Sequence, residues 1–268
     1  MEKISHILEK GTGKLNEDAV SINGSVFGVF DGATSLDKKI FENGLTGGFI
    51  ASNTAKNIFL NKKGSLKDLA NKANKSIYNK MTENYVDTSD KSNLWSTSAA
   101  VVKIDKNTLN WIQIGDSLIL IIYKDGSYKI PVTDFDHDLE TLTMWKNISH
   151  KTDKSIMEEL ETQIIKVRKR MNIDYGVLNG EKEFSSFLKS GTEDLQSIDS
   201  ILLFTDGLFI PSENPGENNF DKMIELFNKG GLENIRDYIR NKEKKDPYCK
   251  KYPRFKTHDD IGAVCLNC

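Results

Sequence analysis

Acidic residues stand at the ends of several short apolar stretches of this sequence. Three stretches run into an acidic residue beside a glycine: Val26–Phe30 before Asp31-Gly32, Trp111–Ile114 before Gly115-Asp116, and Ile201–Thr205 before Asp206-Gly207. Two acidic pairs come just before apolar stretches: Glu17-Asp18 before Ala19–Ile22, and Asp259-Asp260 before Ile261–Leu266. A strand fixes the direction of its end residue, and a following glycine lets the backbone turn or approach closely.

Carboxylates that meet at one rim repel each other unless a cation neutralises them. Hard divalent cations such as Mg²⁺ and Mn²⁺ prefer carboxylate, carbonyl and water oxygens. Asp-Gly is also a common turn dipeptide with no further role, and spacing alone does not bring the five positions together. The pattern therefore indicates a metal site, with ordinary turns as the alternative.

The order of these motifs resembles the metal-dependent protein phosphatases of the PPM, or type-2C, class, in a divergent, prokaryotic-type form. The residues that carry the resemblance are Asn16-Glu17-Asp18, Phe30-Asp31-Gly32, Ser96-Thr97-Ser98-Ala99, Gly115-Asp116-Ser117, Thr205-Asp206-Gly207 and Asp259-Asp260-Ile261. It spans the chain from about residue 11 to 266, and the order and spacing are more specific than any single motif. It implies a β-sandwich of two mainly antiparallel sheets flanked by helices, in four layers α-β-β-α.

The resemblance implies two Mn²⁺ or Mg²⁺ ions as cofactors. Asp31 would bridge both ions, the Gly32 carbonyl would bind one, and Asp206 and Asp259 would complete the sphere of the other. Glu17 and Asp18 would act close by, partly through water. Asp116 matches a position that helps to hold a third, weaker metal. Asp260 stands where many relatives have Asn, so it ranks below Asp259 as a direct ligand.

The reaction implied is hydrolysis of phosphate monoesters, with phosphoserine and phosphothreonine in proteins as the expected substrates. Two metals roughly 3.5–4 Å apart lower the pKa of a shared water and neutralise developing charge, so a metal-bridged hydroxide attacks without a phosphoenzyme. Asp31 and Asp206 are the central catalytic residues in this interpretation. A small phosphorylated metabolite is an alternative substrate. A catalytically inactive binding or regulatory module is a further alternative, which retention of the carboxylates disfavours.

The cation expected to grip the substrate phosphate departs from the family pattern. Relatives carry an Arg a few residues before the Glu-Asp pair, but the stretch here is Gly11-Thr12-Gly13-Lys14-Leu15-Asn16, and no Arg precedes Arg168. Loss of that Arg favours the inactive alternative. We assign the phosphate role to Lys14, with Lys10 as second choice and an ordinary solvated lysine as the alternative. His6 is a weaker candidate for a general acid.

Several elements must position these residues. The strands expected beyond those named above are 98–104, 109–114, 118–123 and 128–132, joined by turns at 105–107 and 124–127. Apolar periodicity predicts helices over about 43–60, 65–77, 153–171, 221–228 and 232–242, the first with Phe49, Ile50, Ile58 and Phe59 as core residues. Short turns make consecutive strands antiparallel, and helices in separate blocks favour the α+β class.

We expect a single domain over residues 1–268. The segment of about 134–183 matches the better-known members poorly, and comparable segments form a mobile flap beside the metals that influences substrate choice. Its basic run Lys166–Arg170 is interpreted as a solvated helix face, with docking of an acidic or phosphorylated partner as the alternative.

Composition limits the remaining function classes. The 268 residues carry a net charge of −2, which disfavours a nucleic-acid binder, whose affinity depends on concentrated positive charge. No apolar run approaches the roughly 20 residues of a bilayer crossing, and no signal peptide is evident. Three sparse cysteines, Cys249, Cys265 and Cys268, fit a reducing compartment. We therefore expect a cytoplasmic monomer whose partner is a phosphorylated protein.

Overall fold

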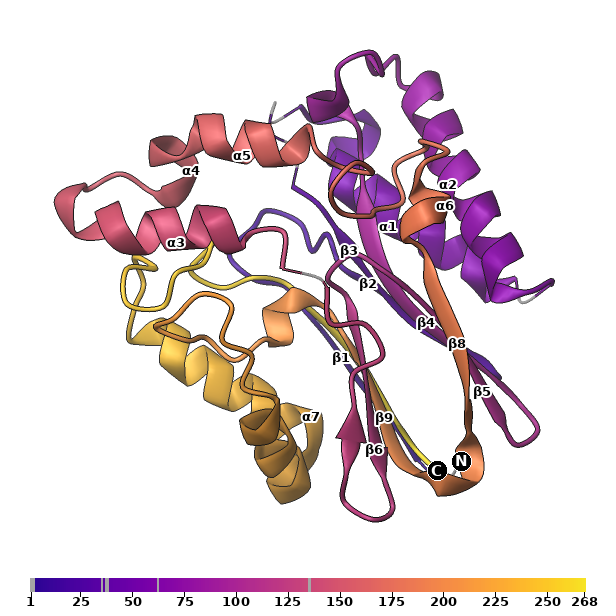
Figure 1. Ribbon diagram of the computed structural model, residues 1–268. Helices are drawn as coiled ribbons and strands as arrows, with labels where there is room; N and C mark the ends of the chain where they lie inside the picture. The colour runs from indigo at the N-terminus through magenta and orange to yellow at the C-terminus, as the bar shows by residue number, and fades with distance from the viewer. Residues whose placement is uncertain (1–2, 35, 37–38, 62, 135) are drawn as a thin grey trace.

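The computed structural model describes residues 3–34, 36, 39–61, 63–134 and 136–268. Two five-stranded sheets lie face to face (Figure 1). One has the order β1 (Lys3–Glu9), β10 (Ile261–Asn267), β9 (Ile198–Phe204), β6 (Leu118–Tyr123) and β7 (Tyr128–Lys129). The other has the order β2 (Ala19–Asn23), β3 (Val26–Gly32), β4 (Thr97–Asp105), β5 (Thr108–Ile114) and β8 (Lys189–Asp194). Every described strand pair is antiparallel.

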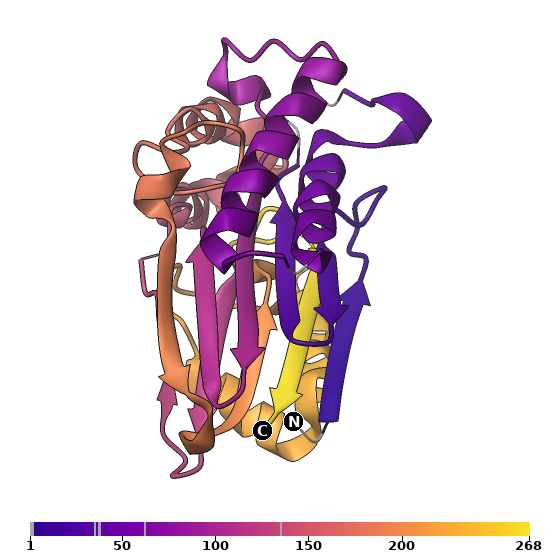
Figure 2. The same cartoon turned by 90° about the vertical axis from the view of Figure 1, so that its right-hand side faces the viewer.

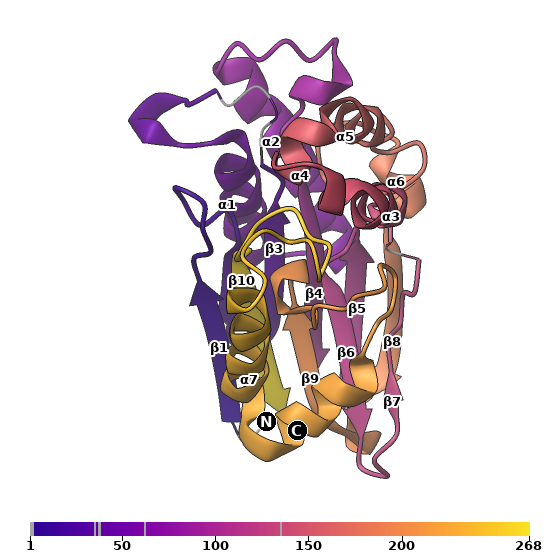
Figure 3. The ribbon, with the colours of Figure 1, turned by 90° about the vertical axis from the view of Figure 1, so that its left-hand side faces the viewer.

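Alternation along the strands divides the apolar residues between two faces. In β3, Phe27 and Val29 point into the core between the sheets, whereas Val26 and Phe30 point to the outer face. The outer face of this sheet is covered by α1 (Gly47–Leu60) and α2 (Leu66–Glu83), as Figure 2 shows. On the other sheet, α7 (Phe220–Lys244) covers the outer face (Figure 3). The four-layer α-β-β-α expectation is confirmed.

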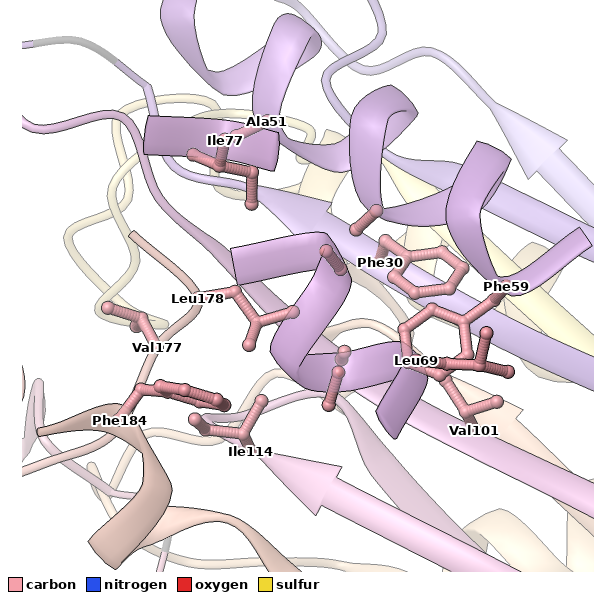
Figure 4. Close-up of a cluster of buried hydrophobic side chains, with 14 of the residues drawn as sticks. Phe30, Ala51, Phe59, Leu69, Ile77, Val101, Ile114, Val177, Leu178 and Phe184 are labelled. Carbon is pink, nitrogen blue, oxygen red and sulfur yellow. The ribbon is translucent and has the colours of Figure 1, made fainter. Parts of the chain in front are cut away.

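Helices α1 and α2 owe their ends to local capping. Ser65 caps α2 through a capping box with Asp68, which satisfies two otherwise free backbone donors. The predicted helix over 43–60 begins later, at Gly47, because residues 42–44 form a 3₁₀ turn in which Asn43 has a φ of 62°. Of its four expected core residues only Phe59 is fully buried. Figure 4 shows its ring beside Phe30.

Helix α7 contains an internal break where the sequence predicts one. Gly230 and Gly231 have non-helical backbone angles, and Gly231 has a φ of 69°, which an L side chain rarely adopts. The prediction of two helices separated by these glycines is confirmed. The apolar residues of both halves, including Met223, Leu232 and Ile239, pack on the sheet.

The prediction of one helix over 153–171 is wrong. The chain forms α4 (Ile156–Glu159) and α5 (Glu161–Arg168), interrupted at Leu160, whose φ of −111° and ψ of 24° are not helical. With α3 (Leu139–Ile148), these helices lie beyond one end of the sheets (Figure 1). They enclose a small core of their own around Trp145, Ile156 and Ile164.

Further elements complete the chain. They are α6 (Phe184–Phe187) and the 3₁₀ turns η1 (Glu42–Gly44), η2 (Lys91–Asn93), η3 (Ser149–Lys151), η4 (Leu195–Ser197) and η5 (Asp206–Leu208). The strand expected over 128–132 is shorter in the structure, where β7 covers only Tyr128–Lys129. Elements β1, β8 and α3 were not predicted from the sequence. Within the described residues, no helix combines the length and the apolar character that a membrane crossing requires.

Candidate metal centre

The antiparallel sheets bring the acidic strand ends to one end of the sandwich. Asp31 stands near the end of β3, and Asp206 directly follows β9. Asp18 and Asp259 come just before β2 and β10, which run in the opposite direction to these strands. Asp31, Asp116, Asp206 and Asp259 line a single cavity of about 490 Å³, together with Gly32.

These carboxyl groups perturb one another strongly. Desolvation, followed by repulsion from neighbouring carboxylates, raises the pKa of Asp18, Asp31 and Asp206 well above the ordinary value. Asp31 is repelled by Asp18, Asp206, Asp116 and Asp259. The side chain of Asp31 also interacts directly with Asp206 and lowers the pKa of Asp206, but desolvation and repulsion outweigh this effect. The cluster therefore needs positive charge.

The donor set fits a hard divalent cation. It consists of carboxylate oxygens and the Gly32 carbonyl, the ligand types that Mg²⁺ and Mn²⁺ prefer. Among the residues that the structure describes, no three His, Cys, Asp or Glu side chains already form a cage around one point. Asp259 is paired with a cation of the protein itself.

That partner of Asp259 is Lys256, which sequence reasoning missed. The distance from Lys256 Nζ to Asp259 Oδ1 is 2.7 Å, and the lysine side chain is 28% exposed. Its ammonium also attracts Asp31 and Glu17. Desolvation opposes the charged form, but attraction to these carboxylates outweighs it and the pKa of Lys256 is raised. The i,i+3 spacing to Asp259 is the one signal in the sequence that could have indicated the pair.

Close packing at two glycines, Gly115 and Gly207, positions the turns that carry Asp116 and Asp206. At Gly115 the φ is 74°, and a Cβ there would lie 2.6 Å from the Cβ of Ser98. Ser98 Oγ in turn contacts Ser117 Oγ at 2.7 Å, which fixes the turn that carries Asp116. At Gly207 a Cβ would lie 1.8 Å from the Asp260 carbonyl oxygen. Only glycine lets the Asp206 turn pack this closely on the start of β10.

Asp18 is held by a hydroxyl from the opposite sheet. Thr205 Oγ1 donates to Asp18 Oδ2 at 2.7 Å, and the same hydroxyl accepts from the Gly262 N–H at 2.9 Å. The bond lowers the pKa of Asp18, but desolvation is the larger effect. Asp18 therefore lies inside the acidic cluster and links β2 to β9 and β10.

Asp260 and Glu17 are engaged in the protein's own hydrogen bonds. Asp260 accepts from the backbone N–H groups of Gly11 at 2.7 Å and Glu17 at 2.8 Å. The Glu17 carboxylate accepts from Thr46 Oγ1 at 2.6 Å and Thr34 Oγ1 at 2.5 Å. Both side chains are buried. They brace the segment before β2 against the cluster, and a part in metal binding remains a prediction for both.

The backbone of Asp259 is fixed from α7. Arg240 donates from Nη2 to the Asp259 carbonyl oxygen at 2.8 Å, and its other nitrogens contact Glu9 at 2.8 Å and Glu243 at 2.9 Å. His258 Nδ1 contacts Glu243 at 2.7 Å. One guanidinium thus ties the loop before β10 to α7 and to the end of β1.

Lys14 lies away from the lining of the acidic cavity. Its side chain is exposed, and its backbone oxygen accepts from Lys10 Nζ at 3.4 Å. Thr12 and Gly13 line the cavity instead. His6 is exposed in the edge strand β1, opposite Val264. The role of Lys14 in phosphate binding stays a prediction.

Two other cations line the cavity, Lys256 and Arg168. Arg168 ends α5 and donates from Nη2 to the Thr34 carbonyl oxygen at 3.3 Å. The rest of the basic run points elsewhere: Lys166 pairs with Glu140, Lys169 with Asp90, and Arg170 with Asp174. The solvated-face interpretation fits these three residues but not Arg168.

An aromatic stack closes one side of the cavity. The His137 and Tyr175 rings lie parallel, with centroids 4.0 Å apart. His137 Nε2 lies 3.8 Å from Asp116 Oδ2 and 3.6 Å from Asp138 Oδ2. Desolvation raises the pKa of Asp138. The segment around α3 to α5 thus contributes both charge and apolar surface to this end of the sandwich.

Comparisons with known proteins agree with this arrangement. Residues 8–240 match the family model described as protein phosphatase 2C. Among solved structures, the chain is similar to the serine/threonine phosphatase PstP/Ppp of Mycobacterium tuberculosis, with a TM-score of 0.62, 14% identity and coverage of 99% of this chain and 97% of that one. A structure of the PstP catalytic domain in complex with two manganese ions has a TM-score of 0.60 at 15% identity, with 99% and 97% coverage.

The chain is also similar to the serine/threonine phosphatase Stp1 of Staphylococcus aureus. The TM-score is 0.62 at 15% identity, and the match covers 100% of this chain and 95% of Stp1. At these identities the structural likeness shows the fold alone. No curated protein matches the sequence.

Proposed function

The chain belongs to the protein phosphatase 2C family and is a protein phosphatase, and from this premise we propose that it hydrolyses phosphoserine and phosphothreonine esters in proteins with the help of divalent cations. The observation that carries the proposal is the convergence of Asp31, Asp206 and Asp259 on one cavity. Carboxylates that repel each other this strongly cost stability unless they serve to bind a cation.

The residues of the proposed site have different roles. Asp31, Asp206, Asp259 and the Gly32 carbonyl would hold Mn²⁺ or Mg²⁺, and Asp18 would support them. When bound, such ions supply positive charge that activates water and neutralises a phosphate ester. Asp116 stands at the rim, where a third, weaker ion is proposed. Arg168 and Lys256 present positive charge to the cavity, which a dianionic phosphoryl group requires.

We propose direct attack by water rather than by a protein nucleophile. Desolvation raises the pKa of Cys249 to about 11 and that of Cys265 to about 12, so both are neutral thiols at physiological pH. The thiolate, not the thiol, is the nucleophile. Cys265 lies in β10, and none of the three cysteines lines the acidic cavity. These observations support a reaction without a cysteinyl-phosphate intermediate.

The segment of about 134–183 is proposed to act as the flap that influences substrate choice. It supplies His137, Val167, Arg168 and Tyr175 to the wall of the cavity. Its last part, Val177 and Leu178, packs into the core below α1 and α2 (Figure 4). Met171 is buried in the same core, so we confine the proposed flap to the part before Met171, within a single domain over residues 1–268.

The substrate class is tested by comparing four phosphate esters at saturating Mn²⁺. They are a phosphothreonine peptide, a phosphoserine peptide, a phosphotyrosine peptide and p-nitrophenyl phosphate. We expect the first two to have the highest kcat/KM. Turnover confined to p-nitrophenyl phosphate would favour the small-molecule alternative. Bound metal without turnover of any ester would favour the inactive binding module.

We also propose that the protein acts as a cytoplasmic monomer. All three cysteines are free thiols, which is consistent with a reducing compartment. Light scattering coupled to gel filtration tests the oligomeric state, and a mass of twice 30.3 kDa would contradict the proposal.

A further inference from the structure

Lys256 is placed among carboxylates rather than at the protein surface. Its Nζ contacts Asp259 Oδ1 at 2.7 Å, and the two side chains are 28% and 29% exposed. Asp18, Asp31 and Glu17 also lie within the electrostatic reach of this ammonium. It thus provides positive charge inside a group of residues that otherwise repel one another.

The contact also occupies Asp259. Its Oδ1 accepts from Lys256 Nζ and from the backbone N–H of Asp260 at 2.9 Å. A carboxylate oxygen has two lone-pair sites, and these two donors use both. A divalent cation that takes Asp259 as a ligand through Oδ1 must therefore displace the ammonium.

Arg240 keeps the backbone of Asp259 in place by its bond to the carbonyl oxygen. The carboxylate can then exchange its partner without movement of the loop. Lys256 has four methylene groups between its backbone and its charge, so the ammonium can leave Asp259 while remaining at the cavity.

We propose that Lys256 is a positioning residue that acts as a tethered counter-cation, holding Asp259 and the acidic cluster together until a divalent cation replaces it. The inference rests on the proposed metal centre and adds a competition between protein charge and metal charge at Asp259. Removing the ammonium should destabilise the metal-free protein and tighten metal binding. A merely structural lysine would not move these two quantities in opposite directions.

The test compares Lys256→Met with Lys80→Met. Lys80 makes an i,i+3 ion pair with Glu83 at 2.6 Å on the exposed face of α2, so it matches the spacing but not the site. Titration calorimetry with Mn²⁺ should show a Kd that is roughly three- to tenfold tighter in Lys256→Met, as expected for loss of one partly exposed competing ion pair. In EDTA its Tm should fall by about 2–4 °C. Lys80→Met should change neither quantity, and Lys256→Arg should restore both.

A labelling experiment on the unaltered protein covers the case in which Lys256→Met does not fold. Acetylation of lysines by a succinimide ester is followed by mass spectrometry with and without Mn²⁺. We expect Mn²⁺ to speed the labelling of Lys256 about threefold or more, because the ammonium is freed from Asp259, and to leave Lys80 unchanged. Unchanged or slower labelling of Lys256 would overturn the inference.

The outcomes separate this inference from the proposed function. If the unaltered protein binds no Mn²⁺, the metal centre itself fails. If it binds Mn²⁺ and Lys256→Met binds equally or more weakly, the metal centre stands and the counter-cation role is wrong.

Discussion

At the scale of single residues, desolvation and mutual repulsion of the carboxyl groups of Asp31 and Asp206 set the behaviour of the metal-free site. The folded-state pKa of Asp31 is raised, first by desolvation and then by its acidic neighbours. Protonated Asp31 therefore favours the folded protein at pH values below the ordinary Asp pKa. This contribution to stability is lost as the pH rises through the raised folded-state pKa of Asp31. The metal-free protein should be less stable at neutral than at acidic pH on account of this group.

Asp31→Asn tests that statement. In EDTA at pH 7 we expect the free energy of unfolding of the variant to be higher than that of the unaltered protein by on the order of 1–2 kcal/mol. The reason is that Asn carries no charge, so burial of an ionised carboxylate no longer costs stability. Near pH 4 the difference should nearly vanish. Urea unfolding at both pH values measures it, and a variant that is less stable at pH 7 would contradict the assignment.

Arg168 is expected to hold the substrate phosphate from the end of α5. Arg168→Ala should raise KM for a phosphothreonine peptide about five- to tenfold, with a smaller change in kcat, because it removes a charged contact made in the ground state. The matched control is Arg170→Ala, since Arg170 pairs with Asp174 on the exposed side. Lys14→Ala in the same assay decides between the two cations: a larger rise in KM there would favour Lys14.

The acidic residues could be found from sequence because strand ends and Asp-Gly turns are local signals. Lys256 and Arg168 could not be found in this way. Lys256 reaches the cluster only when the loop before β10 folds against β3 and β9. Arg168 reaches it only because α4 and α5 break at Leu160 and lie across the end of the sheets.

At the scale of elements, Arg240 connects α7 to the loop that carries Asp259. Its guanidinium is 11% exposed and its partner Glu243 is 4% exposed. Arg240→Met should lower the free energy of unfolding by about 3 kcal/mol, because the buried carboxylate of Glu243 would lose its guanidinium partner. It should also weaken Mn²⁺ binding through the displaced Asp259.

Arg236→Met is the control for that prediction. Arg236 lies one turn earlier on α7, and its side chain is 27% exposed and lies 3.7 Å from Glu9. Urea unfolding and Mn²⁺ calorimetry should show little change. If both variants lost stability and metal affinity equally, the specific link from Arg240 to the metal centre would be wrong.

The elements that sequence reasoning missed share a physical cause. β1 and β8 are flanking strands with mostly exposed or half-buried residues, so they lack the apolar run that marks a buried strand. The central strands β3, β4, β6 and β9 were found because they are buried on both faces. The break at Leu160 carries no glycine or proline, so no local signal in the sequence indicates it, and Leu160 packs into the small core of α3 to α5.

At the scale of the whole molecule, the two sheets combine strands that are far apart in the sequence and hold an acidic site at one end of the sandwich. The net charge of −2 conceals this local excess of carboxylate. The α+β class and the layered order could be predicted because turns and apolar periodicity are local. The depth of the cavity and the cations within it depend on contacts between residues far apart in sequence.

Metal binding should therefore stabilise the whole fold. At a free Mn²⁺ concentration of 100 times Kd, one site adds about 2.7 kcal/mol, which corresponds to a rise in Tm of roughly 5–10 °C for a chain of this size. Differential scanning calorimetry measures the shift, and EDTA should reverse it. An equal shift in Asp31→Asn would show that Mn²⁺ binds elsewhere.

The most direct test of the central claim is turnover of a phosphothreonine peptide by protein stripped with EDTA and then supplied with Mn²⁺. We predict no turnover after EDTA, recovery with Mn²⁺, and a loss in kcat of about 100-fold or more in Asp206→Asn. Asp221→Asn, whose partner is the exposed Tyr128 of β7 outside the lining of the cavity, should match the unaltered protein. Turnover that survives EDTA, or Asp206→Asn at full rate, would contradict the account.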